Sequence, residues 1–575
     1  AQKTQAPNPT PMNDLDETDI DAALEDARDH HQAGRLSEAE TLYRQVLDAQ
    51  PRAAEVLSKL AAALAGQGKL DDAGEALGRA LDIDPDLVEA HNNLGTVQQI
   101  RGDLEDAARS YGRALAIDPS HASAHVNLGH VLKRQGKLED AIVSYRRALV
   151  IDPGFAEAHN GLGVSFLVQG KPEEATVSFV NALKISPQHA EAHNNLGTVL
   201  RNQGRLGEAV ASIQRALALA PDLVEAHINL GNARKSQRRV DDAAEAYRRA
   251  LSLDPANPEA HWNFAQVLLL MGRLREGWAE YAWRTKCEEF RAVNWNFKQP
   301  LWDGSDLGGR TVLLYAEQGF GDTIQFLRYL PMVAAPGTDK GGDVILQCPP
   351  PLTRLFEAAP AADGIQLVTK IGDTPFDLQA PLHGLPGLFA TTLDTIPADV
   401  PYLRPPGETP PGLETSGGFK VGLVWAGNPK HKNDANRSVS FEQFQPLLDI
   451  KGVKFYSLQV GERSRDIGAP RLSGLDGKIS DLGKDLGDFA DTAATVGQLD
   501  LVITVDTSVA HLAGALGTPV WTLLPWVPDW RWLLDRDDSP WYPTMRLFRQ
   551  PAAGDWDAVI GEVGAALRDQ VEGGS

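Results

Sequence analysis

The sequence has 575 residues and a formal net charge of −22, because 77 Asp and Glu outnumber 55 Lys and Arg. Such an acidic chain is a poor general binder of nucleic acid, whose phosphates are bound by clustered Lys and Arg. The net charge does not exclude a local basic pocket. Two cysteines, Cys287 and Cys348, exclude for practical purposes a disulfide framework and a cysteine-based zinc site.

The first 16 residues are polar and rich in proline, so we expect 1–16 to form a disordered tail. They lack the basic region and apolar core of a signal peptide. No apolar run approaches the roughly 18 residues that a membrane-spanning helix requires. We therefore expect a soluble, cytoplasmic protein that does not bind nucleic acid and does not span a membrane.

The segment 17–288 repeats every 34 residues. Prolines stand at one position of successive repeats: Pro51, Pro85, Pro119, Pro153, Pro187, Pro221 and Pro255. Glycines stand at another: Gly68, Gly102, Gly136, Gly170, Gly204 and Gly272, with Arg238 as the one exception. Because proline ends a helix, each repeat should fold as two helices with a turn at the glycine.

The period and the recurring string Ala-His-x-Asn-Leu-Gly resemble the tetratricopeptide repeat (TPR) family. The resemblance implies a superhelix of stacked helix pairs with a concave inner face. The histidine of the string is expected to pack between helices.

An asparagine follows this histidine by two residues in most repeats: Asn93, Asn127, Asn195, Asn229 and Asn263, with Gly161 interrupting the series. An amide offers both a donor and an acceptor, so it can pair with any peptide unit. The series resembles the asparagine ladder of TPR-containing protein glycosyltransferases, which implies binding of an extended acceptor polypeptide. Alternatively, these amides only cap or bridge neighbouring helices.

An aromatic-rich linker, 289–309, follows the repeats, and we interpret its tryptophans and those just before it as a hydrophobic seam: Trp278, Trp283, Trp295 and Trp302, with Tyr281. Strands and helices then alternate, which predicts two parallel-sheet lobes, 310–415 and 416–575, with a cleft between them. The expected strands are 311–315, 344–347, 366–368 and 376–380, then 421–425, 454–458, 501–505 and 520–524. A helix is expected over 323–333, a linker over 401–418 and a final helix over 555–571.

The first motif of the lobes is a glycine-containing turn after a strand, formed by Gln318, Gly319, Phe320, Gly321 and Asp322, with Thr323 next. Helix N-termini favour negative charge, so Asp322 should stay ionised and could take a proton from an acceptor hydroxyl. Alternatively, Asp322 is simply a helix N-cap. We expect the turn to line the cleft.

The second motif is the run from Asp506 to Pro519, directly after a buried strand. Asp506 and Thr507 would begin a helix whose free N–H groups can bind phosphate. His511 should lie one turn further along, on the side of Thr507 and Ser508. The alternative is a capped helix with a histidine whose hydrogen bonds are satisfied internally.

These two motifs, together with Gly422-Leu423-Val424-Trp425-Ala426-Gly427-Asn428, resemble the family-9 glycosyltransferases, the heptosyltransferases. The resemblance implies a GT-B fold of two Rossmann-like lobes, the first for the acceptor and the second for the nucleotide sugar. It implies that Asp322 is the catalytic base and that a set of second-lobe residues binds the donor: Asn428, Lys430, Lys432, Arg437, Asp506, Thr507, Ser508 and His511. No metal and no cofactor beyond the nucleotide-sugar substrate is expected.

A third cluster, Asp529-Trp530-Arg531-Trp532, places an arginine between aromatic rings. Trp530 and Arg531 could stack on a base or bind a phosphate of the donor. Alternatively, the cluster is a tryptophan-rich packing plug behind the donor site.

A TPR array joined to such lobes resembles bacterial protein O-glycosyltransferases, most closely the FlmG-type flagellin glycosyltransferases. That class implies a CMP-activated nonulosonic acid of the pseudaminic type, Ser or Thr as acceptor, and flagellin as the protein partner. Two alternatives remain: a TPR scaffold or chaperone with inactive lobes, and a glycosyltransferase acting on lipid or polysaccharide.

Overall fold

The computed structural model describes residues 17–288, 290, 297–334, 342–407, 413, 417–468 and 477–573. The expected tail 1–16 and Trp295 lie outside these residues. The chain divides into two compact units, Ala1–Asn229 and Leu230–Ser575, each of which is described by itself. No helix in the described ranges has both the length and the apolar character needed to span a bilayer.

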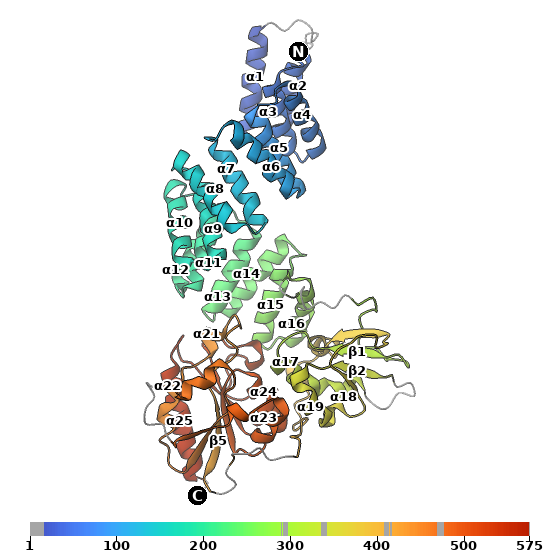
Figure 1. Ribbon diagram of the computed structural model, residues 1–575, viewed down its shortest axis with the longest axis vertical. Helices are drawn as coiled ribbons and strands as arrows, with labels where there is room; N and C mark the ends of the chain where they lie inside the picture. Colours follow the sequence, from blue (N-terminus) through green and yellow to red (C-terminus); the bar gives the residue numbers. More distant parts are fainter. Residues whose placement is uncertain are drawn as a thin grey trace, which may run out of the picture. The chain divides into compact units, whose positions relative to one another are not determined.

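The first unit consists of helices in consecutive pairs, coloured from blue to green in Figure 1. Their bounds are α1 (Glu17–Gln32), α2 (Leu36–Ala49), α3 (Ala54–Gly66), α4 (Leu70–Ile83), α5 (Val88–Arg101), α6 (Leu104–Ile117), α7 (Ala122–Arg134), α8 (Leu138–Ile151), α9 (Ala156–Val168), α10 (Pro172–Ile185), α11 (Ala190–Asn202) and α12 (Leu206–Leu219). Helix α13 (Val224–Ser236) crosses the division between the units. The predicted two helices per repeat are therefore present.

Glycine has a packing role inside the repeats as well as a role in their turns. A Cβ on Gly129 would stand 2.6 Å from the Tyr145 ring of the following helix, so only glycine lets the two helices approach this closely. Gly95 and Tyr111 repeat the arrangement one unit earlier. At the turns, Gly102 has a φ of 91°, a backbone conformation that other residues rarely adopt.

The second unit begins with the last repeat helices, α14 (Val240–Leu253), α15 (Pro258–Leu270) and α16 (Leu274–Tyr281), and the short helix η1 (Ala282–Lys286). The division thus falls inside α13, whereas the sequence places a domain boundary at 288. Arg238, the exception in the glycine series, shows why. Its guanidinium donates to the Leu534 carbonyl at 3.3 Å and lies 4.6 Å from the centre of the Trp526 ring, so this repeat turn is joined to the α/β part.

The aromatic junction forms the expected seam within this unit. Trp278 is buried, its ring centre lies 5.2 Å from that of Trp530, and its indole N–H donates to the Thr391 carbonyl at 3.2 Å. Tyr281 is buried beside it, whereas Trp283 stacks on His261 within the repeat helices.

The first sheet has four parallel strands in the order β3-β2-β1-β4. Its strands are β1 (Val312–Tyr315), β2 (Val344–Gln347), β3 (Gln366–Val368) and β4 (Leu378–Pro381), each within two residues of the predicted bounds. The single helix expected over 323–333 is wrong. Helix α17 (Phe320–Phe326) gives way to η3 (Leu327–Tyr329) and α18 (Leu330–Val333), because Pro331 has no N–H to continue the ladder.

The second sheet has six parallel strands in the order β10-β9-β8-β5-β6-β7. Its strands are β5 (Phe419–Val424), β6 (Val453–Ser457), β7 (Ile479–Asp481), β8 (Leu501–Val505), β9 (Val520–Leu524) and β10 (Met545–Arg549). The edge strands β7 and β10 are not among the strands predicted from the sequence. The expected linker 401–418 is also partly wrong, because Leu403 is fully buried and its N–H donates to the Ala515 carbonyl; 408–412 and 414–416 lie outside the described residues.

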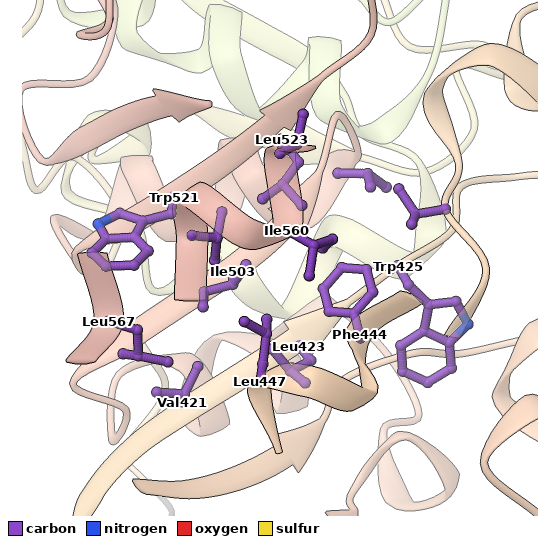
Figure 2. Packing of buried hydrophobic residues seen from close by; sticks show 14 of the residues in the cluster. Val421, Leu423, Trp425, Phe444, Leu447, Ile503, Trp521, Leu523, Ile560 and Leu567 are labelled. Carbon is purple, nitrogen blue, oxygen red and sulfur yellow. The ribbon is translucent and has the colours of Figure 1, made fainter. Parts of the chain in front are cut away.

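The terminal helix α25 (Trp556–Gly573) covers one face of the six-stranded sheet, together with α22 (Phe441–Phe444). Figure 2 shows Ile560 and Leu567 of α25 among strand side chains such as Leu423 and Ile503. Successive side chains of a strand point to opposite faces of the sheet. Those that alternate with the core residues, such as Thr504, point toward the face that carries α23 (Phe489–Val496) and α24 (Ser508–Leu516). A parallel sheet covered on both faces explains the continuous apolar runs of its central strands.

Each sheet reverses its strand order at one point, between β1 and β4 in the first and between β5 and β8 in the second. In open parallel sheets such points, at the carboxyl ends of the strands, are where ligands bind. The turn of Gly321 follows β1, and Asp506 follows β8 directly. Both sequence motifs therefore lie at switch points.

Candidate functional site

The two sequence motifs of the α/β part pack directly against each other. A Cβ on Gly321 would stand 2.7 Å from Cδ2 of His511 and 3.3 Å from Cα of Ser508. The first turn of α17 therefore meets the first turn of α24, and only a glycine hydrogen fits between them. This contact brings the candidate base Asp322 beside the candidate donor residues.

Asp322 occupies the third position of α17, and Gly319 is the N-cap. The alternative that Asp322 is itself the N-cap is therefore wrong. Its Oδ2 accepts the Gly319 N–H at 3.0 Å, and its Oδ1 forms an ion pair with Arg531. Burial alone would raise the pKa of this carboxyl, but Arg531 holds that pKa well below its usual range. Asp322 is therefore ionised, as the sequence analysis expects.

Each of the three guanidinium nitrogens of Arg531 bonds to another side chain of the protein. Besides Asp322, its Nη1 donates to Oδ1 of Asp529 at 2.8 Å and its Nε donates to Oε1 of Gln325 at 2.5 Å. Its guanidinium lies 4.2 Å from the ring centre of Trp530, which is itself buried. This geometry matches the packing-plug alternative for the cluster, and a phosphate would have to displace a carboxylate to reach Arg531.

The start of α24 is a capped helix end. Thr507 is its N-cap and accepts the Val509 N–H at 3.3 Å, while the hydroxyls of Thr504 and Thr507 are 3.0 Å apart. Burial, reinforced by the Asp529 carboxylate, raises the pKa of Asp506 to about 6. Ser508 is partly exposed at the first helical position.

His511 is buried inside the protein rather than open to solvent. Its Nδ1 lies 2.9 Å from the Tyr542 hydroxyl, and its ring stacks at 5.3 Å on Trp532. Burial, together with Arg531, lowers the pKa of His511 to about 3, so the ring is neutral at pH 7. This arrangement matches the alternative of an internally satisfied histidine, and its Nε2 edge faces Gly321.

Only one residue of the predicted basic loop turns toward this site. A Cβ on Gly427 would stand 2.5 Å from Nη2 of Arg437, and the positive charge of Arg437 lowers the pKa values of both Asp506 and His511. The remaining three predicted loop residues are exposed: Asn428, Lys430 and Lys432. The Asn428 side chain accepts the N–H of Lys430 at 3.0 Å.

The other residues of the first turn divide between surface and interior. Gly319 is exposed, whereas the Thr323 hydroxyl is buried and donates to the Gly319 carbonyl at 3.2 Å. Nε2 of Gln318 is buried without a partner in the described part of the chain.

Two further residues, Glu317 and His383, lie behind Asp322 and were not predicted as site residues. The pairing of β1 with β4 ends at Tyr315 and Pro381, two residues before each of them, and Nδ1 of His383 lies 3.8 Å from Oε2 of Glu317. Glu317 forms an ion pair of 2.6 Å with Arg284 of η1, and the two side chains are 6% and 3% exposed. A histidine two residues after an apolar strand was the signal that could have identified His383.

Within the ranges that the structure describes, no three His, Cys, Asp or Glu side chains are grouped so that they could hold a metal ion. The polar groups of the site are instead arranged as pairs of opposite charge.

The asparagine series of the repeats connects successive first helices. The Nδ2 groups of three of these residues donate to an asparagine one repeat earlier, at 3.0 to 3.1 Å: Asn127 to Asn92, Asn195 to Asn160 and Asn229 to Asn194. Asn93 donates to the hydroxyl of Ser58, and Asn263 makes no side-chain hydrogen bond with any described residue. The asparagines therefore bridge neighbouring helices, as expected in the alternative to peptide binding. Each bridge uses only one of the two amide N–H groups of the donor asparagine, whose side chain is half-buried.

The histidine series is internal to its repeats. Nε2 of His91 lies 2.9 Å from the carbonyl oxygen of Pro85, and His125 and Pro119 show the same contact at 3.0 Å. These histidines tie the start of each first helix to the preceding proline turn, which is a structural role.

Family models match the repeat region. The model described as "TPR repeat" matches residues 100–136, 129–170 and 234–272, and the model described as "Tetratricopeptide repeat" matches 24–88 and 160–224. The helix pairs of these segments are therefore tetratricopeptide repeats, as predicted from the 34-residue period. Repeats of this type indicate protein–protein interaction.

The chain is also similar to Protein FlbA of Caulobacter vibrioides, with 32% identity over 336 residues, covering 53% of this chain and 54% of FlbA. The chain thus spans about half the length of this curated relative. Similar solved structures include the APC/C hetero-tetramer Cut9–Hcn1, with 19% identity, 48% and 55% coverage and a TM-score of 0.41. Another is YrrB, a TPR protein with an unusual peptide-binding site, with 22% identity, 32% and 96% coverage and a TM-score of 0.27.

Proposed function

We propose that the protein is a GT-B-type, metal-independent protein O-glycosyltransferase, which moves a sugar from a nucleotide sugar to Ser or Thr of a protein bound by the repeats. One observation carries this proposal. The turn that holds ionised Asp322 packs through Gly321 on the first turn of α24, and both turns lie at sheet switch points. The acceptor we favour is flagellin, and the donor a CMP-activated nonulosonic acid of the pseudaminic type.

In the proposed reaction, Asp322 takes the proton of the acceptor hydroxyl while the hydroxyl oxygen bonds to the anomeric carbon. The phosphate of the donor leaves with the electron pair of its bond to that carbon. The N-terminus of α24 and Arg437 supply positive potential for this phosphate. Because Arg531 holds Oδ1 of Asp322, the proton is taken by the other carboxylate oxygen, Oδ2.

The repeats would supply the acceptor. Binding the acceptor to the same molecule as the site raises the local concentration of its hydroxyl groups, so weak contacts at the reacting centre suffice. The amide series offers groups that pair with a peptide backbone regardless of its sequence. The amide N–H bonds between repeats hold these side chains in one orientation.

The test is transfer by the purified chain to flagellin, with a panel of nucleotide sugars that includes CMP-nonulosonic acids, measured by intact mass. We expect Asp322→Asn to lower kcat by at least about 10²-fold, the usual contribution of a general base. Gly321→Ala should lower it at least about tenfold, because its Cβ must push the two turns apart.

The matched control is Gly561→Ala. This glycine lies in α25, and a Cβ there meets nothing within 4 Å, so transfer should be unchanged. Full activity of Asp322→Asn would remove this residue as the base. If the wild-type chain transfers none of the sugars, the proposed function is wrong.

A second candidate function is a protein scaffold or chaperone with inactive lobes. The bonds of Arg531 to Asp322, Asp529 and Gln325 favour it, because the protein's own side chains occupy each guanidinium nitrogen. Thermal stabilisation separates the two functions. A transferase should be stabilised by its nucleotide sugar, whereas a scaffold should be stabilised by its protein partner alone.

A further inference from the structure

His383 is a buried imidazole directly behind the candidate base. Its side chain is fully buried, yet neither ring nitrogen has a hydrogen-bond partner among the residues that the structure describes. Its Nδ1 lies 3.8 Å from Oε2 of Glu317, and its Nε2 lies 3.8 Å from Oδ2 of Asp322. Leaving a buried polar group unpaired costs free energy, so such a group calls for a functional explanation.

The charged groups around this ring alternate in sign. Arg284 of η1 pairs with Glu317 on one side of His383, and Arg531 of η11 (Trp530–Trp532) pairs with Asp322 on the other. The Tyr281 phenol faces the same cluster, and burial raises its pKa above the usual range, so it stays neutral. Each carboxylate beside the imidazole therefore also has an arginine partner. Oε2 of Glu317 faces both Arg284 and His383, whereas Arg531 and His383 face different oxygens of Asp322.

We propose that His383 receives the proton that Asp322 takes from the acceptor hydroxyl. This inference rests on the proposed glycosyltransferase function. The O–H bond of the acceptor breaks, its oxygen bonds to the anomeric carbon, and the donor phosphate leaves with the electron pair. The proton passes through Oδ2 of Asp322 to Nε2 of His383. The resulting imidazolium stands between the carboxylates of Asp322 and Glu317.

The arrangement gives each member a reason for its position. A carboxylate paired with a guanidinium is a poor place for a proton to stay, because protonation discards that ion pair. The imidazole can hold the proton, and Glu317 balances the new charge while Arg284 fixes Glu317 in place. The distance of 3.8 Å must shorten to about 2.7–3.2 Å for transfer, and such contacts commonly tighten when substrate binds.

The experiment compares two substitutions in the full chain. His383→Phe keeps a ring that packs on Phe326, whose centre lies 5.0 Å away, but removes both nitrogens. His383→Gln keeps hydrogen-bonding groups but cannot hold a proton. We expect both variants to lower kcat by about 10²-fold with KM for donor and acceptor unchanged. His30→Gln, a change in α1 at a partly buried histidine that accepts an N–H of Arg35, should leave both constants as in the wild type.

The double variant Asp322→Asn/His383→Gln gives a second readout. If the two residues act as one unit, it should lose no more activity than Asp322→Asn alone. A folded His383→Phe or His383→Gln variant with kcat within about twofold of the wild type would overturn the inference, and one of the two suffices if the other fails to fold. An inactive wild-type chain would instead refute the proposed function, and this inference with it.

Discussion

The ion pairs of the repeat helices lie mainly at the surface, with buried Glu40 as an exception, whereas the α/β part also keeps ion pairs in its interior. At the start of α16, Arg273 pairs with Glu276 on the surface, where the two side chains are 36% and 57% exposed. In the α/β part, Glu317 and its partner Arg284 are almost completely buried. The repeats gain their stability from packing of small apolar residues, whereas the α/β part keeps charges in its interior, where they perturb one another strongly.

The largest effect expected from this difference follows the loss of one partner of a buried pair. Arg284→Ala leaves the Glu317 carboxylate buried without a counter-ion, which should lower the free energy of unfolding by about 3–5 kcal/mol. Arg273→Ala removes an exposed pair of the same type and should cost less than about 1 kcal/mol. Urea unfolding of both variants, followed by circular dichroism, measures the two values.

Equal costs for the two arginine variants would contradict the comparison. A small effect of Arg284→Ala would mean that Glu317 finds another partner or takes up a proton. A variant that also replaces Glu317, Arg284→Met/Glu317→Leu, distinguishes these cases. It should recover most of the lost stability, because apolar residues of similar volume replace buried ion pairs well.

The same difference explains which parts of the fold could be predicted from the sequence. The repeat helices follow from local signals, since Pro119 and Gly136 each act within their own repeat. The central strands of both sheets follow from apolar runs such as 501–505. The edge strand β10 could not be predicted, because Arg546 and Arg549 break its apolar pattern and only its pairing with β9 defines it.

The candidate site could likewise be predicted only where its residues are close together in the sequence. The turns at Gly321 and Thr507 were found as motifs because their residues are adjacent in the sequence. The bonds of Arg531 to Asp322 and Gln325, and the place of His383 beside Glu317 and Asp322, depend on contacts between segments far apart in the chain. No local pattern carries that information.

A second test uses the buried titratable groups of the α/β part, which should make its stability depend on pH in two opposite directions. His511 has a pKa of about 3 in the folded protein and about 6.5 when unfolded, so below pH 6.5 the unfolded chain gains a proton and stability falls. Asp506 has a pKa of about 6 when folded and about 3.9 when unfolded, so below pH 6 the folded protein gains the proton and stability rises.

Two single variants separate these contributions between pH 7 and pH 5. His511→Gln should remove a loss of about 2 kcal/mol on acidification, and Asp506→Asn should remove a gain of about 1 kcal/mol. Relative to the wild type, the pH dependence of the unfolding free energy therefore changes with opposite sign in the two variants. A change of the same sign in both would contradict the assigned protonation states.

The smallest expected effect concerns Arg238, where a repeat turn is joined to the α/β part. This residue has a φ of 59°, a conformation that costs about 1–2 kcal/mol for a residue with a Cβ. Arg238→Ala loses the contacts with Trp526 and Leu534 and keeps that backbone cost, whereas Arg238→Gly loses the same contacts and relieves it. The glycine variant should therefore be more stable than the alanine variant by about 1 kcal/mol in thermal unfolding.

If the contacts of Arg238 outweigh its backbone cost, the wild type will be more stable than both variants. A glycine variant that equals or exceeds the wild type would show that this arginine does not stabilise the unit, and that the repeats and the α/β part are held together by the seam around Trp278 instead.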